Sequence, residues 1–294
     1  MSFTQSDWMR GIGGDKNIAD IFIPGSHDSS TARVFFPLIA RCQSTTISDQ
    51  LSAGCRFFDL RLTVRDGRLF AVHGRAPCYS PEKKGRTPLD AREIFDAIAA
   101  FLRRNPSETV LAAIKQEGRP NAGFRKILYD YISDYEFYSK NELPSLDEVR
   151  GRIVLLRRFD APEKNGDLIG GINVYDTWSS EHPAPGDSRT AAVLGCERGE
   201  PRAPFCLQDE FTYGVKKKWE QAVKPMIDRG SQPGELFLNY LSCTGRLSPK
   251  AAAVPLNKKF LAEPTLRGGG IYIFDYFTPE LAKKVYGFNT DLYL

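Results

Sequence analysis

Residues 21–31 read IFIPGSHDSST. The apolar, β-branched run at 21–23 predicts a short strand, and Pro24 with Gly25 marks a turn after it. His27 and Asp28 follow at once, in a chain that contains three histidines in all. This stretch alone leaves two interpretations of His27 open: a buried core residue, or a group placed at a strand end to move protons.

Runs of the same kind recur along the chain. They lie at 21–23, 56–63, 69–72, 109–115, 153–157, 205–208, 236–241 and 271–274. Most are continuously apolar rather than alternating, which is typical of strands buried on both faces of a parallel sheet. The sequence therefore predicts about eight strands in a mainly parallel sheet.

Helical patterns lie between several of these runs. In the strongest, Thr87 is the expected N-cap, Pro88 the first helical residue and Asp90 part of the first turn. Apolar side chains then share one face until the pattern stops at Asn105 and Pro106. They are Ile94, Phe95, Ile98, Phe101 and Leu102. Weaker helical patterns cover 123–134, 215–228 and 279–285, and the Gly/Pro-rich stretch 160–204 predicts irregular loop.

Strands that alternate with helices predict an α/β fold, and about eight strands suit a closed barrel. No repeat, low-complexity tract or linker divides the 294 residues, so we expect one domain over 1–294. The hydrophobic share of 41% and the charged share of 26% are those of a folded protein.

Charge and cysteine usage exclude several functions. The net charge of +4 is mild and dispersed, so nucleic-acid binding is not expected, although it would help contact with an anionic lipid surface. The six cysteines show no CxxC or Cys/His spacing, which predicts buried thiols rather than a zinc site. Neither a secretory signal nor a membrane-spanning run is visible, so we expect a cytoplasmic protein, or a secreted one without its pre-sequence.

Polar groups follow the carboxyl ends of the predicted strands. They are His27, Asp28, Asp59, Arg61, His73, Lys115, Glu117, Arg157, Arg158, Asp209, Ser242 and Asp275. Any one of them could be a surface residue. Two of the three histidines belong to the set, however, and Asp59 and Arg61 lie inside an apolar run where an unpaired charge is costly. The pattern predicts a polar site at the carboxyl rim of a barrel. His182, in a loop stretch, is predicted on the surface.

Two histidines, several carboxylates and an arginine suit general acid–base catalysis on a phosphodiester. A neutral imidazole removes a proton from the nucleophile, and a protonated one gives a proton to the leaving oxygen. Each imidazole needs a carboxylate to orient it, and an arginine neutralises the phosphate.

Eight stretches of the chain, in the same order, resemble the bacterial phosphatidylinositol-specific phospholipase C family. They read IPGSHDSST, GCRFFDLRL, VHG, FLRRNPSETVLAAIKQE, RGRIVLLRRF, LQDEF, LNYLS and IYIFDYF. The resemblance implies an irregular, incompletely closed TIM-type (β/α)8 barrel. It also implies a lyase reaction in which the inositol 2-hydroxyl attacks phosphorus. This step releases diacylglycerol and inositol 1,2-cyclic phosphate, which is then slowly hydrolysed.

The resemblance also implies roles for individual residues. His27 is the expected general base, supported by Asp275, and His73 the general acid. Asp28 would link His73 with Arg61, which would contact the phosphate. Asp59 would orient its neighbours. The positions that match the family's inositol-binding residues are Lys115, Glu117, Arg158, Asp209 and Phe211. Bacterial relatives usually carry tyrosine at the place of Phe211, so this chain lacks that hydroxyl.

A metal ion and other cofactors are not expected. Eukaryotic-type members of the superfamily hold Ca²⁺, and one of their ligands lies where this chain has Arg61. A guanidinium can replace the charge of the metal but cannot share its site. The resemblance therefore implies metal-independent activity.

The segment ARVFFPLIAR, residues 32–41, bears on membrane contact. Phe35 and Phe36, with Leu38 and Ile39, are either a short element that inserts at the bilayer interface or a helix or loop packed on the barrel mouth. We expect peripheral membrane contact at most, and a monomer. Trp178 and Trp219 are predicted to be packing residues.

Two other functions stay open at this point. One is a related barrel phosphodiesterase on glycerophosphodiesters or sphingomyelin, although such relatives hold a metal through acidic residues and Arg61 argues against it. The other is a catalytically inactive lipid-binding module, which the retained His27, His73, Asp275 and Arg61 argue against. The lipid itself, whether phosphatidylinositol, a glycosyl-phosphatidylinositol anchor or a phosphorylated inositide, is also open.

Overall fold

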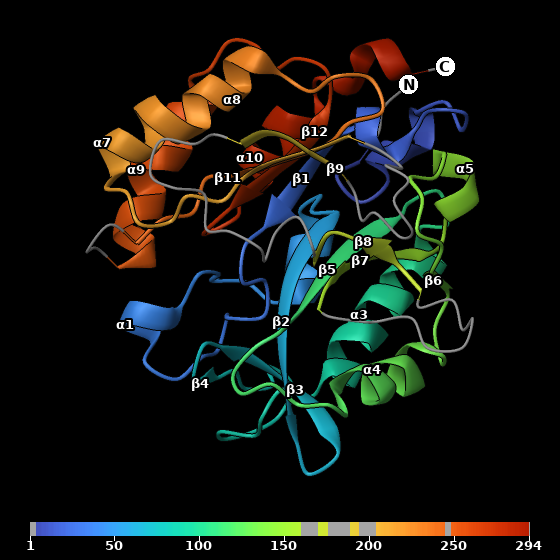
Figure 1. The fold of residues 1–294 in the computed structure, drawn as a ribbon, viewed down its shortest axis with the longest axis vertical. Coiled ribbons are helices and arrows are strands. Elements are labelled where there is room, and N and C mark those ends of the chain that lie inside the picture. Colours follow the sequence, from blue (N-terminus) through green and yellow to red (C-terminus); the bar gives the residue numbers. More distant parts are fainter. Residues whose placement is uncertain (1–3, 160–169, 176–188, 194–203, 245–247, 294) are drawn as a thin grey trace.

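A twisted sheet with helices packed around it forms the centre of the molecule (Figure 1). The computed structural model describes residues 4–159, 170–175, 189–193, 204–244 and 248–293. Eight parallel strands follow one another across the sheet. Their order is β6 (Phe137–Tyr138), β7 (Ile153–Arg158), β5 (Val110–Gln116), β2 (Phe57–Arg65), β1 (Phe22–Ser26), β12 (Gly270–Phe274), β11 (Leu236–Tyr240) and β10 (Pro204–Gln208).

The barrel does not close within the described residues. β9 (Arg189–Val193) pairs antiparallel with β10 at one end of the sheet, β8 (Ile172–Asn173) pairs with β7 near the other, and no pairing joins the two ends. This confirms the α/β fold and the incompletely closed TIM-type barrel, and it corrects the closed barrel that the strand count alone suggests.

One predicted strand does not belong to the parallel set. Residues 69–72 lie in β3 (Arg68–His73), which runs antiparallel to β2 and then pairs with β4 (Ala76–Pro77). The cause is the two-residue turn at Asp66 and Gly67, where both φ angles are positive, at 49° and 70°. An Asp-Gly pair between two apolar runs is a hairpin signal, so the sequence did carry this information. The eighth parallel strand is instead the two-residue β6.

The continuous apolar runs are buried on both faces, as the sequence predicts. In β2, Phe58 and Leu60 pack under the helices, while Phe57 belongs to a second cluster on the inner face. The same alternation holds in β5, where Ala112 packs outward and Ala113 inward. The inner series in β2 continues from Phe57 to positions 59 and 61, so these two polar side chains face the barrel interior.

Helices cover the outside of the sheet (Figure 1). Their bounds are α1 (Pro37–Ala40), α2 (Ile47–Ser52), α3 (Ala91–Arg104), α4 (Phe124–Ile132), α5 (Leu146–Val149), α7 (Val215–Lys218), α8 (Lys224–Arg229), α9 (Pro249–Leu261) and α10 (Pro279–Tyr286). A π-helical turn at Trp219–Val223 joins α7 to α8, so the predicted helix over 215–228 is continuous but irregular. Short 3₁₀ turns lie at Trp8–Gly11, Ile18–Asp20 and Asn289–Leu292.

The strongest predicted helix is confirmed except at its start. The predicted apolar face of α3 is buried, and Asn105 is its C-cap. Its N-cap is Asp90, whose side chain accepts a hydrogen bond from the backbone of Arg92, and not Thr87. Residues 88 and 90 form β-bridges with Tyr79 and Phe70 instead, and these bridges hold the chain extended up to the cap.

Part of the sequence-based interpretation lies outside the described residues. Trp178, His182 and Cys196 fall there, as does much of the predicted loop 160–204. Within that loop, residues 172–173 and 189–193 form strands, which the prediction missed. Trp219 is buried, as predicted, and the cysteines that the structure describes are buried free thiols. No helix among the described residues has both the length and the apolarity to cross a bilayer.

Candidate active site

The pairing of β1 with β12 brings His27 and Asp275 together. The two strands are parallel with Ser26 opposite Phe274, so the next residue of each strand lies at the same level of the rim. Nδ1 of His27 lies 2.7 Å from Oδ1 of Asp275, which is buried. This carboxylate holds the Nδ1–H tautomer of His27 and leaves Nε2 facing the site.

Asp28 connects three groups of the site. Its Oδ1 lies 2.7 Å from Nε of Arg61, while its Oδ2 lies 3.3 Å from Nε2 of His27 and 3.3 Å from Nε2 of His73. The residue has a φ of 42°, in the left-handed region that non-glycine residues rarely adopt. Such backbone strain often occurs at functional sites, and here it accompanies a carboxylate directed between the two histidines.

His73 reaches the site from the antiparallel hairpin. β3 runs back along β2, with Ala71 opposite Leu62, so its last residue returns to the level of the rim. Nδ1 of His73 lies 2.7 Å from the backbone oxygen of Ala40. Because that oxygen can only accept, Nδ1 carries a proton and Nε2 is the atom directed at Asp28.

Three cationic side chains stand side by side on the inner face of neighbouring strands. Arg61 of β2 is opposite Lys115 of β5, which is opposite Arg158 of β7. Asp59 lies two residues before Arg61 and accepts a hydrogen bond from Nη1 of Arg158 at 2.9 Å. Glu117 lies 3.6 Å from both Arg61 and Lys115, measured from its Oε2. The register therefore forms a cationic row held in place by carboxylates.

The loop after β10 carries the last two predicted residues. Asp209 is half-buried, and its charge acts on Arg61, so it belongs to the same rim. Phe211 is 44% exposed, an unusual state for a phenyl ring. The fold thus brings all the predicted catalytic and binding side chains to one rim.

Charge pairing shifts the protonation of the central groups. Burial disfavours the charged form of His27, but the charges of Asp28 and Asp275 outweigh it and raise its pKa to about 9. Burial likewise acts to raise the pKa of Asp59, yet Arg61 and Arg158 bring it down to about 2. The carboxylates around Arg61 hold its pKa well above the usual value, despite its burial. Asp59 and Arg61 therefore stay charged at any physiological pH.

The two forms of His27 have different partners. In the neutral form, Nε2 accepts a hydrogen bond from Nη2 of Arg61 at 2.9 Å, and it is free to act as a base once a substrate displaces that contact. In the protonated form, Nε2–H faces Asp28 at 3.3 Å. Since the pKa is about 9, the protonated form dominates at pH 7 in the free protein.

This raised pKa predicts a pH-dependent stability. The folded pKa of His27, about 9, lies above its ordinary 6.5, so the extra stability is fully present below pH 6.5 and is lost as the pH rises through 9. Between these values the free energy of unfolding should fall by about 3 kcal/mol more than in His27→Gln. Urea denaturation of both proteins at pH 6 and pH 9.5 measures the difference. Equal pH profiles would contradict the charge pairing of His27.

The sequence interpretation missed Gln43, whose side chain holds two strand ends of the site together. This buried side chain donates from Nε2 to the backbone oxygens of His27 and Phe274, both at 2.8 Å, and accepts from the backbone of Phe277. It joins the ends of β1 and β12 just where His27 and Asp275 emerge. Nothing in the local sequence pattern marks it, because its partners lie far away along the chain.

Lys218 was also missed. It is fully buried, and its Nζ donates to Oε1 of Gln208 and to the backbone oxygen of Glu210, both at 2.7 Å. Burial lowers the pKa of this lysine to about 8, against the opposing charge of Asp209. Lys218 thus secures the loop that carries Asp209 and Phe211. Residues 216–218 form a run of three lysines, a pattern typical of a solvated surface, but Lys218 is buried.

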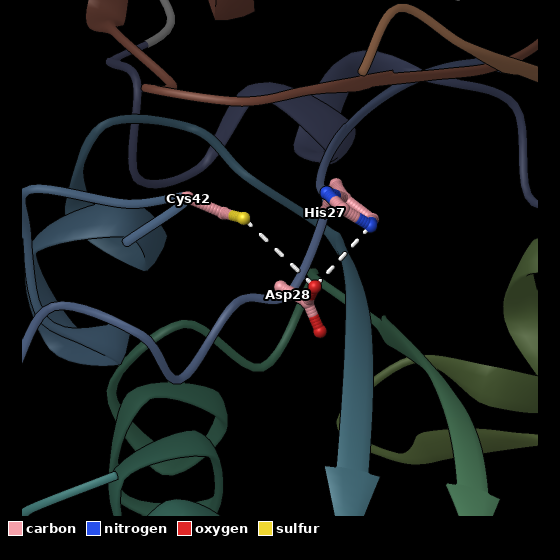
Figure 2. Close-up of side chains that lie close together, drawn as sticks. All are labelled: His27, Asp28 and Cys42. Atoms are coloured by element: carbon pink, nitrogen blue, oxygen red, sulfur yellow. Dashed lines mark hydrogen bonds and ion pairs between the residues drawn. The ribbon is translucent and has the colours of Figure 1, made fainter. Parts of the chain in front are cut away.

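The fold also gathers a set of metal-ligand types that the sequence spacing did not reveal. His27, Asp28 and Cys42 each offer one ligand atom, and these atoms lie within 4.8 Å of one another (Figure 2). The sequence shows no motif that places cysteine and histidine at metal-binding intervals, but the fold brings Cys42 close to His27. Arg61 is paired with the same histidine and aspartate, so its guanidinium supplies the positive charge at this point.

Comparison with known proteins gives a consistent result. Residues 15–159 match the family described as "Phosphatidylinositol-specific phospholipase C, X domain". The chain is 26% identical to the 1-phosphatidylinositol phosphodiesterase of Listeria monocytogenes, over 97% of this chain and 85% of the relative. It is 27% identical to the protein of the same name from Staphylococcus aureus strain Newman, over 82% of this chain and 76% of the relative.

Solved structures share the fold. The phosphatidylinositol-specific phospholipase C from Listeria monocytogenes has a TM-score of 0.74 at 24% identity, covering 97% of this chain and 98% of that one. The phosphatidylinositol-specific phospholipase C of Staphylococcus aureus has a TM-score of 0.75 at 22% identity, covering 96% and 97%. Sequence and fold therefore agree with these relatives over nearly the whole length, and it is residues 15–159 that match the phosphatidylinositol-specific phospholipase C X-domain family.

Proposed function

We propose that this protein cleaves phosphatidylinositol by attack of the inositol 2-hydroxyl on phosphorus, yielding diacylglycerol and inositol 1,2-cyclic phosphate. The observation that carries the proposal is the carboxylate of Asp28, which lies within 3.3 Å of both histidines and holds Arg61 at 2.7 Å. A base, an acid and a phosphate-binding cation thus stand around one point, as cleavage of a phosphodiester requires.

In the first step His27 acts as the base. The neutral form of His27 is the reacting one: Asp275 fixes Nδ1–H, so Nε2 takes the proton of the 2-hydroxyl, and the resulting imidazolium is stabilised by the same carboxylate. The phosphate displaces Arg61 from Nε2 and accepts hydrogen bonds from its guanidinium. Arg61 offers up to five donors in one plane, so it can stay paired with Asp28 while it neutralises the charge that develops on phosphorus.

His73 acts as the acid. With Nδ1–H held by the backbone oxygen of Ala40, the protonated ring directs Nε2–H toward Asp28 and the leaving oxygen of diacylglycerol. The two histidines exchange roles in the slower second step, in which water opens the cyclic phosphate.

The inositol ring would lie against the cationic row of Arg61, Lys115 and Arg158 and against the exposed phenyl ring of Phe211. Lys115, Arg158 and the carboxylates of Glu117 and Asp209 offer donors and acceptors to its hydroxyls, while the face of Phe211 packs on the apolar face of the sugar. A lipid with a choline headgroup offers neither the ring hydroxyls nor the nucleophile. We therefore expect strong preference for inositol lipids over phosphatidylcholine and sphingomyelin.

A lipid panel tests this function. The purified protein is incubated with vesicles that contain phosphatidylinositol, phosphatidylcholine or sphingomyelin, and release of diacylglycerol or ceramide is measured. A 2-O-methyl phosphatidylinositol is the matched control, since it keeps the ring but lacks the nucleophile. Cleavage of phosphatidylinositol alone is expected. Equal cleavage of a choline lipid or of the methylated analogue would overturn the proposal, and absence of any cleavage would favour a lipid-binding module.

The segment with α1 is the proposed membrane contact. Leu38 is 81% exposed and Ile39 69%, and Phe36 is also exposed, whereas Phe35 is half-buried against Phe36 and Arg86. Ala40, at the end of the same helix, contacts His73, so this exposed apolar group lies next to the site. An apolar patch at this place suits insertion into the bilayer interface beside the substrate.

Replacing Leu38 and Ile39 together with serine should weaken binding to anionic vesicles roughly 10- to 100-fold, because two buried aliphatic side chains are lost from the bilayer contact. Cleavage of a soluble inositol phosphodiester should stay unchanged. Vesicle sedimentation and a soluble-substrate assay measure the two effects. Leu261→Ser, at an exposed apolar residue at the end of α9, is the matched control. Equal vesicle binding by the double variant and the wild type would exclude α1 as the contact.

A further inference from the structure

Cys42 lies inside the site, although the proposed cleavage gives it no role. Its Sγ is 3.8 Å from Oδ2 of Asp28, the same oxygen that faces Nε2 of His27 at 3.3 Å. Figure 2 shows the thiol and the imidazole on opposite sides of this carboxylate, both directed at it. A sulfur, a nitrogen and an oxygen ligand therefore surround one point.

The spacing suits a four-coordinate metal ion. Zinc bound to cysteine, histidine and carboxylate has bond lengths of about 2.0–2.3 Å, which in tetrahedral geometry keeps the ligand atoms about 3.2–3.8 Å apart. Two separations in the structure, 3.3 Å from nitrogen to oxygen and 3.8 Å from sulfur to oxygen, match this range, and all three ligand atoms lie within 4.8 Å of one another. Sulfur and imidazole ligands favour thiophilic ions such as Zn²⁺ and Cd²⁺ over Mg²⁺ or Ca²⁺.

Two carboxylates favour a cation at this point. Oδ1 of Asp275 lies 2.7 Å from Nδ1 of His27, and Oδ2 of Asp28 lies 3.3 Å from its Nε2. The negative charge of both would stabilise a divalent ion bound between the three ligand atoms. Cys42 is almost fully buried, but the ring of His27 is 14% exposed, so an ion can enter along the histidine.

We propose that a thiophilic divalent cation, Zn²⁺ being the physiological example, binds Cys42 Sγ, Asp28 Oδ2 and His27 Nε2 and thereby inhibits the protein. On binding, the S–H bond of Cys42 and the Nε2–H bond of protonated His27 break, the electron pair of each forms a bond to the metal, and both protons leave to solvent. The ion occupies the lone pair of Nε2 that the base needs, and it separates Arg61 from His27. Binding stands on the geometry alone, while inhibition rests on the proposed function.

Cadmium titration tests the binding step without an activity assay. Thiolate bound to Cd²⁺ gives an ultraviolet charge-transfer band, so the wild-type protein should develop this band with one equivalent of Cd²⁺. Cys42→Ser and Cys42→Ala should lose it, and His27→Gln should weaken binding. Cys206→Ala, which removes another buried thiol, is the matched control and should keep the band.

Inhibition is then measured on phosphatidylinositol vesicles. Inhibition is expressed relative to the rate of each protein without Zn²⁺. On this scale Cys42→Ser should need at least about 10-fold more Zn²⁺ for half-inhibition, because the loss of a direct ligand weakens metal binding at least as much as the loss of an outer hydrogen-bond partner. Mg²⁺ should inhibit neither protein. No band in the wild type, or equal bands or equal Zn²⁺ sensitivity in Cys42→Ser, would overturn the site. A Cys42-dependent band in a protein that cleaves no lipid would instead overturn the proposed function and leave the metal site standing.

Discussion

His27→Ala should lower the rate of phosphatidylinositol cleavage by about 10³- to 10⁴-fold, at the upper end of what a positioned general base contributes. The variant loses the only group that the proposed mechanism offers to the 2-hydroxyl, while the carboxylate of Asp275 loses its hydrogen-bond partner. Initial rates of diacylglycerol release from vesicles measure the effect. His182→Ala is the control, since it removes the histidine that the sequence predicts on the surface, and it should keep the wild-type rate.

A comparison of His27→Ala with His73→Ala shows which histidine is the general base and which is the general acid. A leaving group such as p-nitrophenolate departs without a proton, so an inositol p-nitrophenyl phosphodiester needs the base but not the acid. His73→Ala should therefore be impaired far less on this substrate than on phosphatidylinositol, whereas His27→Ala should be impaired on both. The opposite pattern would exchange the two roles. A His27→Ala protein that is folded and nearly fully active would contradict the mechanism altogether.

Arg61→Lys is expected to lower kcat by about 10²- to 10³-fold with a smaller change in KM, as for loss of a preorganised donor that acts mainly in the transition state. The guanidinium lies 2.7 Å from Asp28 and 2.9 Å from His27, and 3.5 Å from Asp59. A lysine keeps the charge but cannot contact all three groups and the phosphate at once.

Steady-state kinetics on a soluble inositol phosphodiester measure this loss without the membrane step. Arg92→Lys, at a surface arginine paired with Asp134, is the matched control for the same chemical change. Full activity of Arg61→Lys would mean that a positive charge alone is sufficient at this position. The hydrogen-bond geometry of the guanidinium would then no longer explain why the site has an arginine.

The sequence predicted the strands of the barrel because they are buried on both faces, which makes them continuous apolar runs. It missed the two-residue β6, which is too short to give a pattern, and it took β3 for a parallel strand although the Asp66–Gly67 turn marks a hairpin. The hairpin nevertheless returns His73 to the rim, where its Nε2 lies 3.3 Å from Oδ2 of Asp28.

The sequence predicted which residues form the site better than it predicted how their side chains contact one another. That Asp28 faces both histidines depends on its left-handed backbone, and that Arg61, Lys115 and Arg158 stand in a row depends on the register of three strands. Gln43 and Cys42 lie in a connection between elements, and their partners are brought to them by the fold. Local sequence patterns carry none of this information, because these contacts join segments that are distant in the chain.

Phosphorus NMR of protein treated with EDTA, acting on phosphatidylinositol, tests the central claim most directly. If His27, His73 and Arg61 suffice for the reaction, the first phosphorus product should be inositol 1,2-cyclic phosphate, formed at the same rate with EDTA as with added Ca²⁺, and inositol phosphate should follow more slowly. A reaction that stops in EDTA and returns with Ca²⁺, or that yields the open phosphate with no cyclic intermediate, would contradict the account.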